Sequence, residues 1–433
     1  MKRSLLLFSL LLCVGFMLLG CNQIEEPEIE FPTDVVTDGI FAYSEIKDYQ
    51  GNVQEGVYEV AINPYITLDE KNAIEEIVIP DSYDGRRVIG IANYGFNDCI
   101  NLKKISFSES LEYIGDSAFS GCTSLSYIEI PGYIKRVGSY AFSTCTALET
   151  VIFNEGIEEI DSYAFAFCGS IRAVVLPDSL KSLGEGAFGV CESLVAVTLG
   201  KEINEIETQV FSGCKNLKTI NLSGIETIDN GAFSGCVSLS SVDLSSVTSV
   251  GQYAFQECTG FKTITLNEVE KISDSAFEGC TSLYEINFSD KLSEIGNRAF
   301  ANCELLKEID LTTVKTIGSE AFLGCKSLSD ATILDAYYIG YSAFEDCTGL
   351  KSVIIGDEVT SISGMCFKGC TSLTKIQMGI NVLNVAYMAF EGCTALSDVY
   401  YLGNYGEWEA INIEKSNTYL TSAKINYESM TDK

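Results

Sequence analysis

The chain has 433 residues, of which 46% are hydrophobic and 20% are charged, so it holds enough apolar material for a long core and is not disordered over most of its length. Its 28 Lys and Arg residues are outnumbered by 60 Asp and Glu residues, and the net charge of −32 argues against nucleic-acid binding. Histidine is absent from the sequence. This removes the commonest general base, the Ser-His and Cys-His nucleophile pairs and every His-containing metal site, which excludes most hydrolase mechanisms.

The N-terminus has the features of a lipoprotein signal peptide, which we place at residues 1–20. Two basic residues precede an apolar run from Leu5 to Leu19, which is shorter than the ~20 residues that a membrane-spanning helix needs. The run ends in Leu-Leu-Gly-Cys and resembles the lipobox of bacterial lipoproteins, in which the chain is cut before the cysteine and the thiol receives diacylglycerol. We therefore predict lipidation at Cys21 and an extracytoplasmic location at the cell membrane or cell surface, with acyl chains as the only membrane anchor. An ordinary secretory signal is the alternative.

A tether and a small cap are predicted before the main body of the chain. Residues 21–39 contain six carboxylates and two prolines, a self-repelling composition that keeps a chain extended. We interpret this acidic tether as a spacer without a binding role. Apolar and polar residues then alternate at 41–44 and 57–62, with turn residues between them, and this pattern predicts an N-terminal β cap over residues 40–76.

The dominant feature of the sequence is a cysteine that recurs every 22 or 23 residues in fourteen units, from Cys99 to Cys393. A phenylalanine stands three residues before each cysteine, and Leu, Ile or Phe stands three residues after it. A fixed period of this length is typical of a solenoid, in which units stack to bury a shared core. Within each unit we expect a strand, as at 125–130, then an inward-facing apolar pair, and finally one helical turn at the Ala-Phe segment.

The repeated unit resembles the BspA-like leucine-rich repeat. Residues 114–125 show its pattern: Ile-Gly, two variable residues, Ala-Phe, two residues, Cys, two residues, Leu. The resemblance covers about residues 77–401, and residues 402–433 are similar to the segment that often closes such arrays, here the predicted C-terminal cap. It implies a repeat solenoid of about 14 right-handed, β-rich coils with a parallel concave sheet, short second strands and one-turn helices. It also implies a surface protein of host-associated microbes, from a family whose studied members bind extracellular-matrix or plasma proteins or mediate adhesion and share no catalytic residues.

The ladder cysteines are predicted to be buried free thiols. Stacked coils would place them side by side with roughly parallel Cα–Cβ vectors, whereas a disulfide needs the Cβ atoms turned toward one another. Cys366 replaces the alanine of an Ala-Phe pair, so we assign it to the core. Cys366 and Cys370 are the only close pair in the ladder, and because clustered Cys-x-x-Cys hooks are missing we predict neither a metal site nor a cofactor.

Recognition is expected on the outward positions of the first strands, because the concave sheet of a solenoid is an extended binding surface. These positions are mostly small and polar, carboxylates gather among them from Asp243 to Asp330, and Tyr127 contributes to an apolar patch near the N-terminal end. The interpretation is an acidic groove for a basic protein segment or a hydroxyl-rich glycan; the alternative is a solvated sheet face. The candidate binding residues are Tyr127, Glu129, Asn221, Asp243, Glu285, Asn287, Glu308 and Asp310.

An enzymatic role is not predicted. Glu285, Glu308 and Asp310 are neighbouring carboxylates, and a glycosidase needs two, but a flat repeat face offers no cleft that would separate their pKa values. We therefore predict a lipid-anchored leucine-rich-repeat surface protein that mediates protein or glycan binding or adhesion. Its expected partner is an extracellular protein or glycan, with host matrix proteins among the candidates, and no nucleic acid. The alternative is a structural envelope spacer without a specific ligand.

Overall fold

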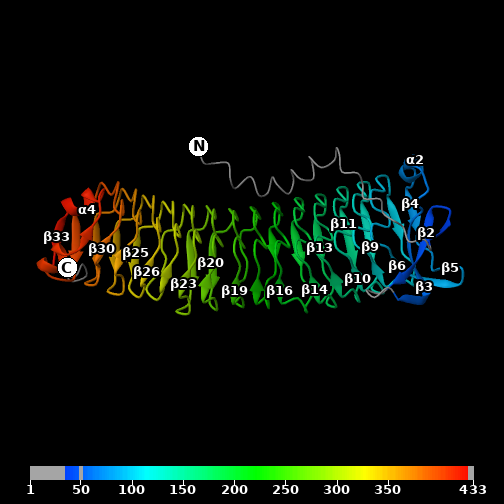
Figure 1. Cartoon of the computed structure of the whole chain (residues 1–433), viewed down its shortest axis with the longest axis horizontal. Helices are drawn as coiled ribbons and strands as arrows, with labels where there is room; N and C mark the ends of the chain where they lie inside the picture. Colours follow the sequence, from blue (N-terminus) through cyan, green and yellow to red (C-terminus); the bar gives the residue numbers. More distant parts are fainter. Residues whose placement is uncertain (1–34, 48–51, 428–433) are drawn as a thin grey trace.

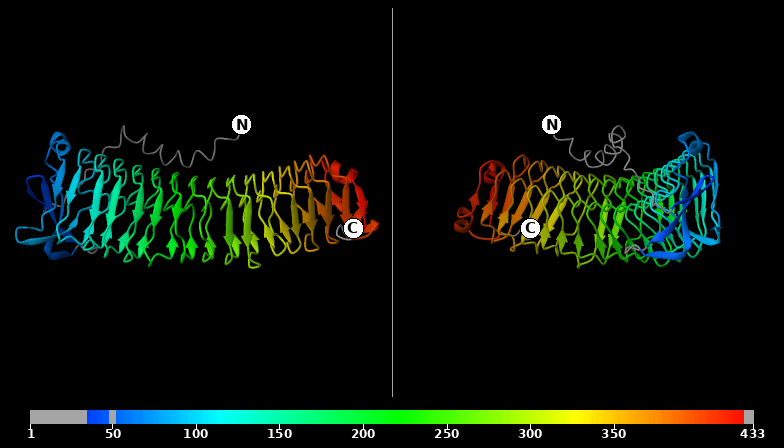
Figure 2. Two further views of the ribbon diagram at one scale, coloured as in Figure 1. Left: turned by 180° about the vertical axis from the view of Figure 1, so that it is seen from behind. Right: turned by 45° about the vertical axis from the view of Figure 1, so that its right-hand side comes forward.

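The structure, a computed structural model, describes residues 35–47 and 52–427. The predicted signal peptide, the lipidation site Cys21 and most of the predicted tether lie outside these ranges. The chain forms an elongated, gently bowed stack of β coils that follow one another from the N-terminal to the C-terminal end (Figure 1). The coils keep this order when the rod is seen from behind and when it is turned by 45° (Figure 2). The predicted β-solenoid is therefore confirmed.

Each coil places strands in two rows. In the first row, strands of two to four residues alternate exposed and buried side chains and pair in parallel with the next coil, as Thr150 does with Tyr127. This alternation buries the apolar residues of each strand against the interior. The first-row strands are β4 (Glu76–Val78), β7 (Lys104–Ser106), β9 (Tyr127–Ile130), β11 (Thr150–Phe153), β13 (Ala173–Val175), β15 (Ala196–Thr198), β17 (Thr219–Ile220), β20 (Thr263–Leu266), β22 (Glu285–Phe288), β25 (Asp330–Ile333), β27 (Ser352–Ile355), β29 (Lys375–Met378), β31 (Asp398–Tyr401) and β33 (Lys424–Asn426).

The second row consists of two-residue strands after its first member, and it forms longer continuous sheets than the first row. One of these sheets runs without interruption from β16 to β26, and β28, β30 and β32 form the last. The strands are β6 (Arg86–Ile91), β8 (Tyr113–Ile114), β10 (Arg136–Val137), β12 (Glu159–Ile160), β14 (Ser182–Leu183), β16 (Glu205–Ile206), β18 (Thr227–Ile228), β19 (Ser249–Val250), β21 (Lys271–Ile272), β23 (Glu294–Ile295), β24 (Thr316–Ile317), β26 (Tyr338–Ile339), β28 (Ser361–Ile362), β30 (Asn384–Val385) and β32 (Asn412–Ile413).

The third side of each coil, from the residues before Ala-Phe to the cysteine, forms turns and no helix, so the prediction of one helical turn is wrong. Two residues per coil have positive φ, as at Tyr140 (56°) and Thr144 (59°), whereas an α-helix needs negative φ throughout. The backbone also bonds across coils: Phe119 N donates to Ala141 O at 2.7 Å. Because these N–H groups are used between coils, they are not available for bonds four residues back along the chain.

The interior is built of side chains that repeat in register. Phenylalanines from Phe96 to Phe390 stack from coil to coil, with successive ring centroids 5.1 to 6.1 Å apart. Beside them the ladder cysteines are buried free thiols, as predicted, and Cys366 is buried with them. From Cys122 onward each ladder thiol donates a hydrogen bond to the phenylalanine carbonyl of the preceding coil, as Cys280 does to Phe255 at 3.2 Å. The sulfur thus fills the core and satisfies a carbonyl between coils.

Additional elements close the two ends. At the N-terminus, β1 (Val36–Asp38), β2 (Phe41–Lys47) and β3 (Val53–Ile62) join the second row through β6, while α2 (Leu68–Asn72) and β5 (Ser82–Tyr83) lie at the first coil. Strand β1 falls within the range that we assigned to the tether. At the C-terminus, β32 and β33 extend both rows past residue 401, joined by α3 (Tyr405–Glu409) and α4 (Thr418–Ser422). The helices within the described ranges have five residues each, too short to cross a membrane.

Candidate binding surface

All eight predicted binding residues are exposed in the first row, but the structure separates them into three groups. Tyr127 and Glu129 lie together on β9, where the Tyr127 hydroxyl is 3.3 Å from a carboxylate oxygen of Glu129. Asn221 and Asp243 line a depression of about 580 Å³ in the middle of the row. The third group, Glu285, Asn287, Glu308 and Asp310, lines a depression of about 840 Å³ together with Asp330. The acidic groove of the prediction is therefore confined to three adjacent coils.

Two carboxylates in this surface also have a local structural role that the sequence analysis missed. Asp310 accepts hydrogen bonds from the backbone N and the hydroxyl of Thr312, at 3.0 and 2.6 Å. Asp243 accepts one from Ser245 N at 3.0 Å. These hydrogen bonds lower the pKa of both carboxyl groups. Each of the two side chains binds the backbone two residues farther along the chain and so closes a turn. Both turns lie in coils where no first-row strand forms.

The sequence does carry a signal for these turns. Each turn has the sequence Asn or Asp, then Leu, then Ser or Thr. Each occurs in a 22-residue unit, whose loop is one residue shorter than that of a 23-residue unit. Asn221 shows the same arrangement, since its side-chain oxygen accepts from Ser223 N at 3.0 Å. In contrast, the carboxylates of Glu285 and Glu308 have no Lys or Arg nitrogen within 4.0 Å among the described residues. These two glutamates therefore keep carboxylate oxygens available to a ligand, although Glu285 also accepts from Asn287 Nδ2 at 3.2 Å.

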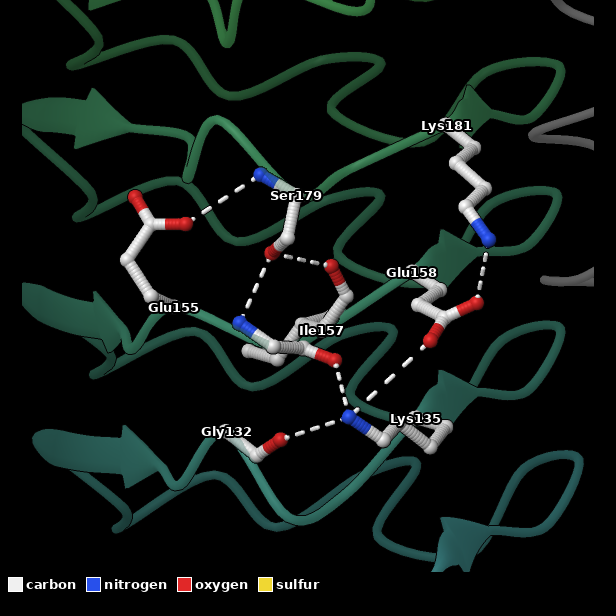
Figure 3. Close-up of polar contacts among 8 residues, drawn as sticks. Gly132, Lys135, Glu155, Ile157, Glu158, Ser179 and Lys181 are labelled. Atoms are coloured by element: carbon white, nitrogen blue, oxygen red, sulfur yellow. Dashed lines mark hydrogen bonds and ion pairs between the residues drawn. The ribbon is translucent and has the colours of Figure 1, made fainter.

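Charges near the second row are paired between coils. Glu158, just before β12, accepts from Lys181 Nζ of the next coil at 2.6 Å, and its other oxygen is 3.9 Å from Lys135 Nζ of the preceding coil (Figure 3). The hydrogen bond from Lys181 and the charges of both lysines hold the pKa of the Glu158 carboxyl below its usual value. Arg136 on β10 likewise pairs with carboxylates of two neighbouring coils. The ion pairs of this side link successive coils.

At the N-terminal end of the first row Lys103 and Lys104 pair with Glu75 and Glu76, but farther along the row five cations are arranged differently, and the sequence analysis did not single them out. Arg172, Lys218, Lys262, Lys307 and Lys351 are exposed, and none has a carboxylate oxygen within 4.0 Å among the described residues. Paired lysines usually have an acid about one period away, as Lys215 has Glu192. The sequence holds a signal for the unpaired lysines in the residues one period away. For Lys262 these residues are Ser and Tyr, which carry no negative charge at neutral pH and cannot form an ion pair.

The buried thiols of the described residues offer no reactive group. Burial raises the pKa of Cys214 and of Cys325 to about 12, so both stay protonated at neutral pH. Among the described residues there is no group of three or more Cys, Asp or Glu side chains that could hold a metal ion. The surface chemistry of the described chain is therefore that of exposed hydroxyls, amides and charges.

The comparisons with known proteins agree with this architecture. A leucine-rich repeat protein from Bacteroides ovatus is 27% identical, with a TM-score of 0.74 over 91% of this chain and 100% of its own. A leucine-rich cell surface protein from Faecalibacterium prausnitzii is 24% identical, with a TM-score of 0.51 over 88% of this chain and 98% of its own, and shares the fold. The comparison with curated proteins gave no match. The family model described as the BspA type leucine-rich repeat region matches residues 67–195, 158–284, 248–339 and 315–429. The chain therefore belongs to the BspA-type leucine-rich repeat family.

Proposed function

We propose that the protein is a lipid-anchored surface protein whose first row binds an extracellular protein or glycan without catalysing a reaction. The observation that carries the proposal is charge pairing: Glu285, Glu308 and the cations at the Arg172 position lack ion-pair partners among the described residues, whereas Arg136 and Glu158 near the second row are paired between coils. Unpaired, exposed side chains on a regular sheet can meet a ligand without breaking contacts that hold the fold. The BspA-type repeats support a surface location, and the motif that ends at Cys21 supports the lipid anchor.

The acidic depression around Glu285 and Glu308 is the part of the face that best fits a basic protein segment. The two residues lie one above the other in adjacent coils, in an isolated parallel bridge, so their side chains emerge on the same side. Their depression is also lined by Asp310 and Asp330, so its four carboxylates outnumber its one cation, Lys307. A run of lysines or arginines in an extended partner strand would face these carboxylates coil by coil, since coils stack at the ~4.8 Å spacing of strands.

A non-catalytic role is supported by the exposure of these carboxylates. General acid catalysis at neutral pH needs a carboxyl whose pKa is raised by burial, whereas the pKa of Asp310 is lowered by its hydrogen bonds to Thr312. The sequence also lacks histidine, and the described thiols are buried.

The proposal is tested by a binding screen of the purified full chain against matrix proteins, plasma proteins and glycans, repeated across a salt series. We expect a salt-sensitive interaction with a basic protein that is weakened by combining Glu285→Gln with Glu308→Gln. The matched control combines Glu159→Gln with Glu205→Gln, which removes two exposed glutamates from the second row. Asp310 is left unchanged because its carboxylate closes a turn.

Two outcomes would overturn this function. If folded protein binds no member of the screen, the structural spacer becomes the better explanation. If binding survives the first-row double variant but not the control, the binding face is wrong. The anchor is tested separately by Cys21→Ser, which we expect to abolish incorporation of a labelled fatty acid and to release the protein from the membrane fraction.

A further inference from the structure

A second charged feature of the first row is a series of unpaired cations, three of which lie outside the acidic depression, whereas Lys307 lines it. Arg172, Lys218 and Lys262 occupy the same position of their coils, directly after the apolar residue that follows the cysteine by three. They recur at every second coil, and all three are exposed. Since neighbouring strands lie ~4.8 Å apart, the charges stand at intervals of roughly 10 Å along the rod.

These cations are unpaired although acids outnumber bases by more than two to one in the chain. Lys215, three residues before Lys218, pairs with Glu192 at 2.7 Å. Glu149 lies one period before Arg172, yet no carboxylate oxygen of the described residues comes within 4.0 Å of the Arg172 guanidinium. The same position of the first unit holds Lys103, which pairs with Glu75 at 3.0 Å, so the lack of partners belongs to the coils from Arg172 onward.

The surface next to the central cation is shallow and carries both polar and apolar groups. It contains the depression of about 580 Å³, in which Thr219 directly follows Lys218. The depression is lined by Ala196, Val197, Thr198, Thr219, Ile220, Asn221, Ser241, Val242 and Asp243. Small side chains keep it open, and hydroxyl and amide groups face outward. The one carboxylate in its lining, Asp243, accepts a hydrogen bond from Ser245 N that lowers its pKa, so it stays charged. The neighbouring cations therefore supply the attraction for an anionic ligand, whose hydroxyl groups can meet those of Thr198, Thr219 and Ser241.

We propose that Arg172, Lys218 and Lys262 form a binding site for a linear polysaccharide that carries a carboxylate on alternate sugars. Such a polymer repeats its charge once per disaccharide, a spacing of the same order as two coils, so successive carboxylates can meet successive cations. Its hydroxyl groups match the Thr, Ser and Asn side chains of the depression. A periodic ligand suits this surface better than a folded protein does, because the cations repeat with the period of the solenoid.

The test measures binding of the full chain to immobilised hyaluronan, with dextran as the neutral sugar polymer and polyaspartate as the acidic peptide. We expect salt-sensitive binding to hyaluronan that exceeds binding to either comparison polymer. Combining Lys218→Ser with Lys262→Ser should weaken it roughly fivefold for each cation removed, the effect of a strong exposed ion pair. A matched control combines Lys181→Ser with Lys271→Ser, which removes two cations that are paired near the second row.

One further variant separates spacing from charge. Combining Lys218→Ser with Ser240→Lys moves the middle cation by one coil and conserves the net charge, since Ser240 is exposed at the same position of the next coil. We expect this variant to bind hyaluronan several-fold more weakly than the parent. Equal binding by parent and relocated variant, a control as weak as the first-row double variant, or equal binding to polyaspartate would each overturn the polysaccharide site. None of these results affects the interaction at Glu285 and Glu308, which is measured with a basic protein.

Discussion

The two rows of strands share one interior but differ in how several of their surface charges are paired. In the first row, charged and polar residues such as Lys218 and Glu308 point outward without ion-pair partners. Near the second row, Glu158 and Arg136 each contact oppositely charged side chains of two other coils. The two rows also differ in their backbone hydrogen bonding, since the second row forms the longer uninterrupted sheets.

This difference teaches which parts of the repeat serve stability and which are free for binding. A solenoid is stable when each coil buries its apolar side chains against its neighbours, and that task is performed by the interior ladders. The second row adds contacts between coils on the surface. The first row contributes its inward residues to the core, so outward positions that do not close a turn, as Asp243 and Asp310 do, can vary with little loss of stability, and ligand binding can be built there.

Alkaline pH should unfold both rows together, because the ladder thiols belong to the interior that the rows share. In the folded protein burial raises the pKa of Cys214, Cys325 and Cys393 to about 12, whereas an unfolded thiol has a pKa of ~8.5. Above ~8.5 the unfolded chain therefore binds fewer protons than the folded one, and each such thiol removes about 1.4 kcal/mol of stability per pH unit until its folded pKa is reached. Below ~8.5 this contribution is fully present.

With many thiols titrating together, we expect cooperative loss of β structure by about pH 10. The measurement is circular dichroism during a pH titration under reducing conditions, with return to neutral pH to show reversibility. Unchanged stability up to pH 11 would contradict the buried, protonated ladder.

Removing one ring from the phenylalanine stack should also weaken both rows. Phe255 is fully buried, and its ring centroid is 5.4 Å from those of Phe233 and Phe277. We expect Phe255→Ala to lower the free energy of unfolding by about 3–5 kcal/mol, the cost of a large cavity. Thr265→Ala, at an exposed first-row position of the same coil, should change it by less than about 0.5 kcal/mol. Denaturant unfolding of both variants checks this, and a similar loss in the two would contradict the division of roles.

Much of the fold can be predicted from the sequence because each coil contacts mainly its neighbours. The 22 or 23 residue period, the phenylalanine at a fixed place and the buried cysteine all follow from local repetition. The third side could not be predicted in this way. Whether a residue such as Tyr140 takes positive φ depends on hydrogen bonds to the next coil, and these are contacts between segments 20 or more residues apart.

The candidate site is predictable to a similar degree. Alternation identifies Glu285 and Glu308 as outward residues, and the structure places both at one depression. The alternation of exposed and buried residues does not reveal that Asp310 closes a turn, although the Asp-Leu-Thr sequence is a local signal for this turn. It is harder to predict which cations lack ion-pair partners. An acid one period away does not ensure an ion pair, as Glu149 and Arg172 show.

Relieving strain on the third side should stabilise the array without touching either row. Val190 has a φ of 58°, a conformation that is unfavourable for a β-branched residue, and glycine occupies the equivalent position in several coils, as at Gly213. We expect Val190→Gly to raise the free energy of unfolding by roughly 0.5–1 kcal/mol, since the relief of strain outweighs the added entropy of the unfolded chain. In the control Val195→Gly, at an ordinary φ, stability should fall. Thermal unfolding distinguishes the two, and destabilisation by Val190→Gly would show that the side chain packs more than it strains.

The smallest expected effect is the most direct comparison of the rows. Arg136 near the second row is paired with Asp116 at 3.1 Å and with Asp161, whereas Arg172 in the first row has no carboxylate partner among the described residues. Arg136→Gln should therefore lower the free energy of unfolding by about 0.5 kcal/mol at low salt, and less at high salt, because partly exposed ion pairs are weak and screened. Arg172→Gln should leave stability unchanged and instead weaken the binding of hyaluronan. If both substitutions cost the same stability at low salt, the charges of the two rows do not differ in role, and the argument that reserves the first row for ligands loses its basis.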